Sequence, residues 1–263
     1  MLPTATAQVP PSSEVGPSEP APSENPPWSG WDVLRIVVVG VVAIAICSIG
    51  ILTLALRRHH HTAADLERDP LLILPAQAIA YVVIVIFMYV LVTRERRKPF
   101  WSAVRWNFPQ HWYAFGAIGV IVAISGQMLS ALLPIPKSLP IDQFFRNPAD
   151  AYAMAAFGVL LAPFVEEMFF RGFLYPVLAR RLGVRIGVVL TALPFALLHS
   201  SQLGSAWGPL LVLFVVGLVL TGVRAVTKSV AASTLVHMGY NFTLFAMLFV
   251  ASGRFQHLER ISQ

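Results

Sequence analysis

Long apolar runs recur along this chain, and they constrain its fold more than any other feature. Each run is about as long as the roughly 20 residues that an α-helix needs to cross the hydrocarbon of a bilayer. We place seven spans, or eight if the fourth run begins afresh at Pro163. The predicted spans are 33–56, 71–93, 112–133, 151–179, 186–200, 208–226 and 230–251. The sequence therefore predicts an all-α, polytopic transmembrane helical bundle.

The composition supports a membrane domain. The chain is 56% hydrophobic and 12% charged, and a soluble domain carries roughly twice that charged fraction. Lys and Arg gather at the ends of the apolar runs, as membrane-flanking charges do. The net charge of +6 therefore indicates contact with the lipid bilayer and no nucleic-acid partner.

The chain divides into three parts. Residues 1–32 are rich in Pro, Ser, Glu and Ala and include no Lys or Arg, which predicts a disordered tail. Residues 33–253 form the predicted membrane domain, and residues 254–263 form a short polar tail.

The basic loops predict an orientation. With seven spans, residues 94–111, 180–185 and 224–228 lie on one side and hold ten Lys and Arg residues. The other side holds seven. The positive-inside rule then puts the N-terminus in the cytoplasm.

Three charged residues lie inside the fourth apolar run, namely Glu166, Glu167 and Arg171. A charge at the bilayer centre costs about 2.5–3.5 kcal/mol on insertion scales, so such residues face a bundle interior and find partners there. Glu167 and Arg171 have i,i+4 spacing and can pair. Glu166 points about 100° away and is free to face elsewhere.

Two further helices carry polar pairs at the same spacing. Phe195 precedes His199 by four residues, and His237 precedes Asn241 by four. Each pair also has a structural reading, as a helix-end histidine or as hydrogen bonding between helices. All three sets together are more readily explained by a functional site.

These residue types suit the hydrolysis of a peptide bond. A buried Glu with a shifted pKa can act as general base toward a water and then as general acid toward the leaving amine. A His can orient that water, and a His with an Asn can donate hydrogen bonds to an oxyanion. Alternatively, Glu166, His199 and His237 could ligate Zn²⁺, although the sequence contains no HExxH.

The motifs Glu166-Glu167-x-x-x-Arg171, Phe195-x-x-x-His199 and His237-x-x-x-Asn241 resemble, in this order, those of the CPBP family. That family includes the type II CAAX prenyl endopeptidases and the bacterial Abi and bacteriocin-immunity proteins. The resemblance covers about residues 150–245.

The resemblance implies an intramembrane endopeptidase. Glu166 would activate the attacking water with help from His199, and His237 and Asn241 would stabilise the oxyanion. Glu167 and Arg171 would support the site by pairing, with Phe195 beside them. No cofactor is required on this interpretation, although the family has also been described as zinc metalloproteases, and zinc remains an alternative.

The expected substrate is a membrane protein or peptide, either a prenylated CAAX-type chain or an unprenylated one. We expect an integral protein of a bacterial plasma membrane. Two alternatives stay open: a non-catalytic scaffold or bacteriocin-immunity factor, and a proton-coupled transporter, because intramembrane Glu and His also form proton relays. The sequence does not indicate an oligomeric state.

Overall fold

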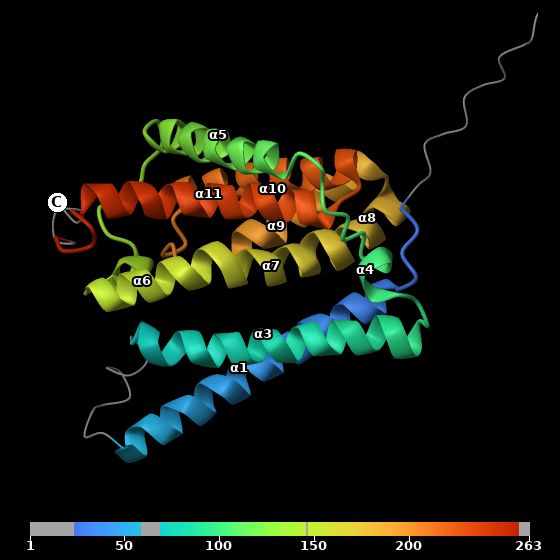
Figure 1. Ribbon diagram of the computed structural model, residues 1–263, viewed down its shortest axis with the longest axis horizontal. Helices are drawn as coiled ribbons and strands as arrows, with labels where there is room; N and C mark the ends of the chain where they lie inside the picture. Colours follow the sequence, from blue (N-terminus) through green and yellow to red (C-terminus); the bar gives the residue numbers. More distant parts are fainter. Residues whose placement is uncertain (1–23, 59–68, 146, 258–263) are drawn as a thin grey trace, which may run out of the picture.

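The computed structural model describes residues 24–58, 69–145 and 147–257, and the regular elements in these ranges are all helical. The longer helices lie side by side in one bundle, and the chain runs back and forth between its two ends (Figure 1). The α-helices are α1 (Gly30–Arg58), α3 (Pro70–Val90), α4 (Phe100–Ala103), α5 (Trp112–Ser130), α6 (Pro148–Ala156), α7 (Ala162–Glu167), α8 (Tyr175–Leu182), α9 (Val184–Leu198), α10 (Trp207–Thr227) and α11 (Val230–Ala251). Short π-helical turns occupy Leu91–Glu95 (η1), Phe157–Leu161 (η3) and Met168–Leu174 (η4), and a 3₁₀ turn occupies Pro140–Phe144 (η2).

Six helical segments of the described chain are long and apolar enough to cross a membrane, which confirms the predicted helical membrane bundle. They are Gly30–Arg57, Pro70–Glu95, Trp112–Ser130, Pro148–Leu182, Trp207–Thr227 and Val230–Ala251. Large apolar side chains such as Val41, Ile121 and Val226 are exposed on their outer faces, as expected of helices in contact with lipid.

The span count differs from the prediction of seven to eight. The predicted fifth span is α9, which has 15 residues and is therefore only about 22 Å long, against about 30 Å of hydrocarbon. The fourth span is not divided at Pro163, because that proline lies in the first turn of α7, just after η3. There its missing N–H costs the helix little, and the helical segment runs from Pro148 to Leu182.

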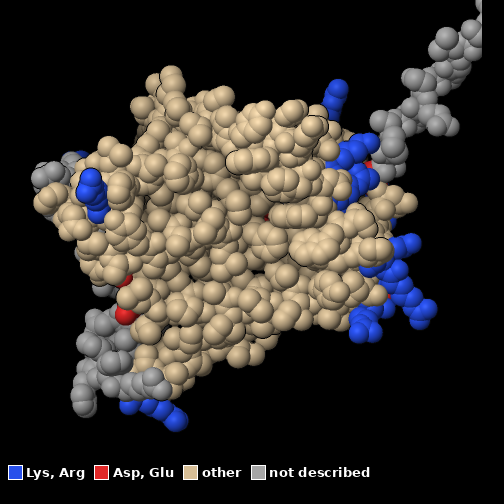
Figure 2. Space-filling view, in the orientation of Figure 1, with Lys and Arg blue, Asp and Glu red and all other residues tan. Residues whose placement is uncertain are grey.

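The two ends of the bundle differ in charge. Lys and Arg gather at the end where α1 begins, α8 ends and α4 lies (Figures 1 and 2). The same end holds the junctions between α8 and α9 and between α10 and α11. The opposite end holds the end of α1, the start of α3, the segment between α5 and α6, and the end of α11.

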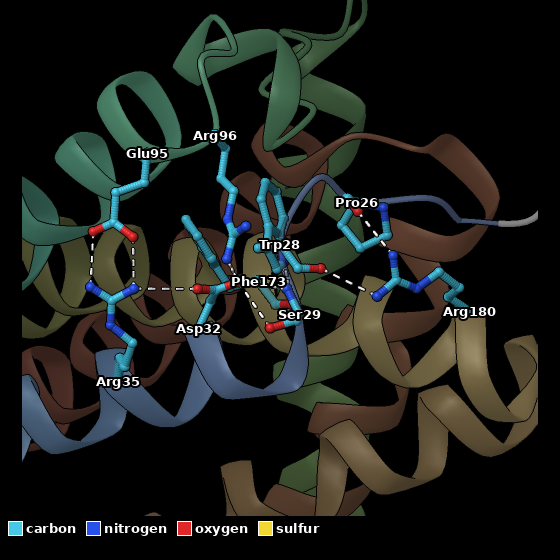
Figure 3. A network of polar contacts seen from close by, with 9 residues as sticks. All are labelled: Pro26, Trp28, Ser29, Asp32, Arg35, Glu95, Arg96, Phe173 and Arg180. Carbon is cyan, nitrogen blue, oxygen red and sulfur yellow. Dashed lines mark hydrogen bonds and ion pairs between the residues drawn. The ribbon is translucent and has the colours of Figure 1, made fainter.

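Residues just before α1 fasten the chain to this basic end. Glu24 is buried, and its Oε1 atom lies 2.9 Å from Nη1 of Arg105 and 3.0 Å from Nη1 of Arg224. The indole N–H of Trp28 donates to the carbonyl oxygen of Phe173, and the two rings stack with centroids 4.4 Å apart (Figure 3). The predicted tail, with its boundary at residue 32, therefore includes residues that pack against the bundle.

The first turn of α1 extends this attachment. Asp32 is buried and accepts hydrogen bonds from Ser29 and Arg96, while Arg35 makes a two-pronged contact with Glu95 (Figure 3). The carboxylate of Asp32 therefore ties the start of α1 to the end of η1. Residues 1–23, which form the rest of the predicted tail, lie outside the described residues, as do 258–263.

Helices α5 and α11 make a close backbone contact. A Cβ atom on Gly119 would meet the carbonyl oxygen of Val236 and the backbone N of Tyr240, both well inside van der Waals contact. Small residues allow this approach, as in many membrane helix pairs. The contact fixes α11, which carries His237, against α5.

We predict that Gly119→Ala lowers the stability of the folded protein by about 1–3 kcal/mol, because the added methyl group meets backbone atoms that cannot rotate away. Gly116→Ala is the matched control, one turn earlier on the same helix, where a Cβ meets nothing within 4 Å. Thermal unfolding of the purified variants in detergent measures both. Equal midpoints for the two variants would contradict the close contact.

Candidate active site

The helical segment that carries the first motif is interrupted by two π-helical turns. The turn η3 precedes α7, which ends with Glu166 and Glu167, and the turn η4, which contains Arg171, follows it. Such turns are rare and occur often at functional sites, because they free backbone groups and redirect side chains. Here both turns lie beside the residues that the sequence singled out.

Three charged or polar side chains form a buried chain of contacts. Nη1 of Arg171 donates to Oε1 of Glu167 at 2.8 Å, and Nδ1 of His237 lies 2.9 Å from the same oxygen. Arg171 and Glu167 are fully buried, and His237 is 4% exposed. Because the carboxylate accepts, Nδ1 of His237 carries the proton in this contact, and its Nε2 atom faces the other way.

Helix α10 completes the binding of Arg171. Nε donates to the hydroxyl of Thr221 at 3.2 Å, and Nη2 donates to the carbonyl oxygen of Gly217 at 3.1 Å. The sequence analysis missed both partners. A threonine and a glycine are ordinary residues in a membrane helix, so their types carry no signal that they hold an arginine.

Phe195 lies at the centre of this group. Its ring centroid is 4.5 Å from the guanidinium carbon of Arg171, and its ring meets His237 edge-on at 5.6 Å and Phe170 edge-on at 5.4 Å. A cation over an aromatic face is attracted by the ring quadrupole. Phe195 therefore helps to hold both Arg171 and His237.

Glu166 has a different environment from its neighbour Glu167. Its side chain is 14% exposed and lines a cavity, and its Oε2 atom is 4.0 Å from Nε2 of His237. His237 thus lies between two carboxylates, with Glu167 at one ring nitrogen and Glu166 near the other.

His199 lies where α9 ends, and its tautomer follows from its backbone contact. Nδ1 is 2.9 Å from the carbonyl oxygen of Phe195, so Nδ1 carries the proton and Nε2 is left as an acceptor. The side chain is half-buried and lines the same cavity as Glu166.

Asn241 joins the cavity to η3. Its Nδ2 atom donates to the carbonyl oxygen of Gly158 at 2.6 Å, and the amide has a second N–H for another acceptor. A Cβ atom on Gly158 would meet the ring of Phe245 at 2.9 Å, so a larger residue there would displace that ring.

The cavity has a volume of about 750 Å³ and collects four of the predicted residues: Glu166, His199, His237 and Asn241. Phe195 also lines it, whereas Glu167 and Arg171 are packed behind its wall. The structure therefore brings all seven predicted residues to one place, with the ion pair as support.

Helix α3 adds two residues to the cavity that the sequence analysis did not assign. Gln77 donates from Nε2 to the hydroxyl of Tyr81 at 3.0 Å, and both side chains line the cavity. The available signal was a polar side chain inside an apolar run, the same signal that identified Glu166.

A zinc site would require Glu166, His199 and His237 to converge on one point. Among the described residues, no three His, Cys, Asp or Glu side chains are grouped so that they could hold a metal ion. Glu166, His199 and His237 share a cavity without forming such a group, so the residues do not fit zinc as they are placed.

Two family models match parts of the chain. Residues 148–243 match the family model described as type II CAAX prenyl endopeptidase Rce1-like. A second family model, the C-terminus of cation transporting ATPases, matches residues 3–169. That range contains membrane helices but stops short of Arg171, His199 and His237. No curated protein and no solved structure matches the chain significantly.

We predict that Arg171→Met destabilises the protein by about 3–5 kcal/mol, because it leaves the Glu167 carboxylate buried without its cation. The double variant Glu167→Leu/Arg171→Met removes both charges and should recover part of the loss. Arg35→Ala, which removes a partly exposed ion pair, is the control and should change the unfolding midpoint little. If Arg171→Met unfolded at the same temperature as the Arg35 control, the pair would have no structural role.

Proposed function

We propose that this chain is an intramembrane endopeptidase whose attacking water is activated by Glu166, because residues 148–243 match the Rce1-like model of type II CAAX prenyl endopeptidases. The observation that supports the proposal most is the shared cavity, where Glu166 lies beside His237, and His199 and Asn241 line the same wall.

The buried charges balance if Glu166 and His237 together hold one proton more than a carboxylate and a neutral imidazole would. Arg171 offsets the charge of Glu167 through their 2.8 Å contact. Ionised Glu166 then needs a protonated His237, or neutral His237 needs a protonated Glu166, since an uncompensated charge is costly inside a membrane. The pair can therefore exchange one proton during a reaction.

Hydrolysis moves a proton of the attacking water through Glu166 in two steps. Glu166 accepts a proton from a water as the water oxygen attacks the carbonyl carbon of the scissile bond. The same carboxyl then gives the proton to the leaving amine as the C–N bond breaks. Nε2 of His199 is oriented as an acceptor by the contact of Nδ1 with Phe195, and it holds the water through the remaining O–H.

The oxyanion requires donors in the same cavity. With Glu166 ionised, protonated His237 presents an Nε2–H group toward the cavity, because Glu167 holds its Nδ1 side. Asn241 supplies the second donor through the amide hydrogen that does not bind Gly158. Fixed donors of this kind stabilise the transition state more than the substrate.

The proposed substrate is a membrane protein or peptide, and the enzyme is an integral protein of a bacterial plasma membrane. The proposed mechanism uses no metal. A metalloprotease would instead lose its activity on chelation.

A transport function has one observation in its favour, the match of residues 3–169 to a cation transporting ATPase model. However, the described residues that line the cavity include none from 91–112, 180–185 or 227–230, which join the helices at the basic end. A cavity that is closed at one end suits hydrolysis better than passage. A scaffold or immunity role remains the other alternative and would tolerate loss of Glu166.

We predict that Glu166→Gln lowers kcat by at least about 100-fold while the unfolding temperature stays unchanged, because the amide is similar in size but is not a base. Purified protein and a library of membrane peptides, with and without a prenylated cysteine, provide the assay. Gln77→Leu, on the same cavity wall, is the control and should retain kcat within a few-fold. Adding a zinc chelator to the wild type should leave the rate unchanged. Normal cleavage by Glu166→Gln would contradict the proposal.

We also predict that Asn241→Ala lowers kcat by about 100-fold or more with a smaller change in KM, because the oxyanion forms only in the transition state. Asn241 also binds Gly158, so thermal unfolding must be measured beside the kinetics. A raised KM with unchanged kcat would assign Asn241 to substrate binding instead.

A further inference from the structure

Among the described residues, those that line the cavity extend to one of the two ends of the bundle and not to the other. Its wall includes the start of α3 at Pro70, the turn η2, the segment 201–203, the start of α10 at Pro209, and the last part of α11 at Leu248. All of these lie at the end opposite to the basic one (Figure 1). Glu166 and His237 are at its inner limit.

The difference in charge between the two ends indicates which side of the membrane each end faces. Residues 94–111, 180–185 and 224–228 lie at the basic end and hold ten Lys and Arg residues. Among the described residues, the other end holds four, namely Arg57, Arg58, Lys137 and Arg254. The excess of Lys and Arg marks the cytoplasmic side, so the basic end in Figure 2 faces the cytoplasm.

The N-terminal attachment lies at the basic end as well. Glu24 contacts Arg105 and Arg224, and Arg180 donates to the carbonyl oxygens of Pro26 and Trp28 (Figure 3). The chain therefore enters α1 from the basic end, and the cavity opens at the far end of the same bundle.

Taking the proposed endopeptidase activity as given, we infer that this cavity opens to the outer, non-cytoplasmic face of the membrane and receives its substrate there. The inference joins two independent observations, the position of the cavity mouth and the asymmetry of Lys and Arg. It makes the substrate the outer segment of a membrane-embedded chain.

The wall of the cavity indicates the chemistry of that segment. Apart from Glu166 and the two histidines, its residues carry no charge at neutral pH. Gln127, Gln143 and Gln202 line it and make no side-chain hydrogen bond among the described residues. Their amides both donate and accept, as the unpaired backbone of an unwound segment requires inside a membrane. Such a wall suits a substrate segment that is uncharged and extended.

This access argues against a prenylated C-terminus as the substrate. A CaaX cysteine is modified near the C-terminus of a chain and holds that chain on the membrane by its lipid. Such a lipid anchor on the cytoplasmic leaflet lies across the bilayer from the cavity mouth. Unprenylated membrane proteins with segments outside the cell can reach the cavity mouth from that side.

Two exposed glutamines provide a matched test of sidedness, one at each end. Gln202 lies in the segment between α9 and α10 at the cavity mouth, and Gln110 lies between α4 and α5 at the basic end. Both are changed to cysteine in a Cys47→Ala background, which removes the single natural thiol. Spheroplasts that express each full-length variant are then treated with a membrane-impermeant maleimide.

We expect Gln202→Cys to react in intact spheroplasts and Gln110→Cys to react only after the membrane is opened. The reverse pattern, or equal reaction of both in intact spheroplasts, would overturn the inference. Labelling does not depend on catalysis, so this result stands even if Glu166→Gln shows that the proposed function is wrong.

The second measurement links sidedness to access. Alkylation of Gln202→Cys from outside should lower cleavage of a membrane peptide at least 10-fold, because the adduct fills the mouth, whereas the treated Gln110→Cys variant should retain its rate. Undiminished cleavage after complete labelling of Gln202→Cys would show that substrate enters elsewhere, and would overturn the inference about access.

Discussion

The buried pair of Arg171 and Glu167 is the interaction on which the rest of the site depends. It brings a cation and an anion into a low-dielectric interior, where either alone would be costly. Every remaining donor contact of Arg171 goes to α10, and the remaining contact of Glu167 goes to α11 through His237. One ion pair thus connects three helices and determines which way the imidazole of His237 faces.

Adjacent residues in the chain perform different tasks because a helix turns between them. Glu167 points into packed protein and serves structure, whereas Glu166 points into the cavity and is available for chemistry. Only the second is next to space that a water or substrate can occupy. The neighbouring carboxylates are therefore not interchangeable, although both residues are glutamates.

The sequence predicts the parts of this arrangement that depend on local geometry. Apolar run length gave the helical bundle, and i,i+4 spacing gave the Glu167–Arg171 pair. It could not give the contact between Glu167 and His237, which are 70 positions apart, because nothing local selects that partner. The buried Trp28 was also missed, since the Pro- and Ser-rich composition around it resembles a tail.

The π-helical turn η4 makes the contacts of this helix sensitive to a change in its length. Such a turn holds one residue more than regular α-helix would at that place. Deleting a single residue between Met168 and Arg171 would leave an unbroken α-helix whose later turns keep their direction, yet Arg171 would then follow Glu167 by three residues in place of four. Its side chain would turn by about 100° and face away from Gly217 and Thr221 on α10. Length changes that surface loops absorb are therefore excluded here, in a helix that would look undamaged by hydropathy alone.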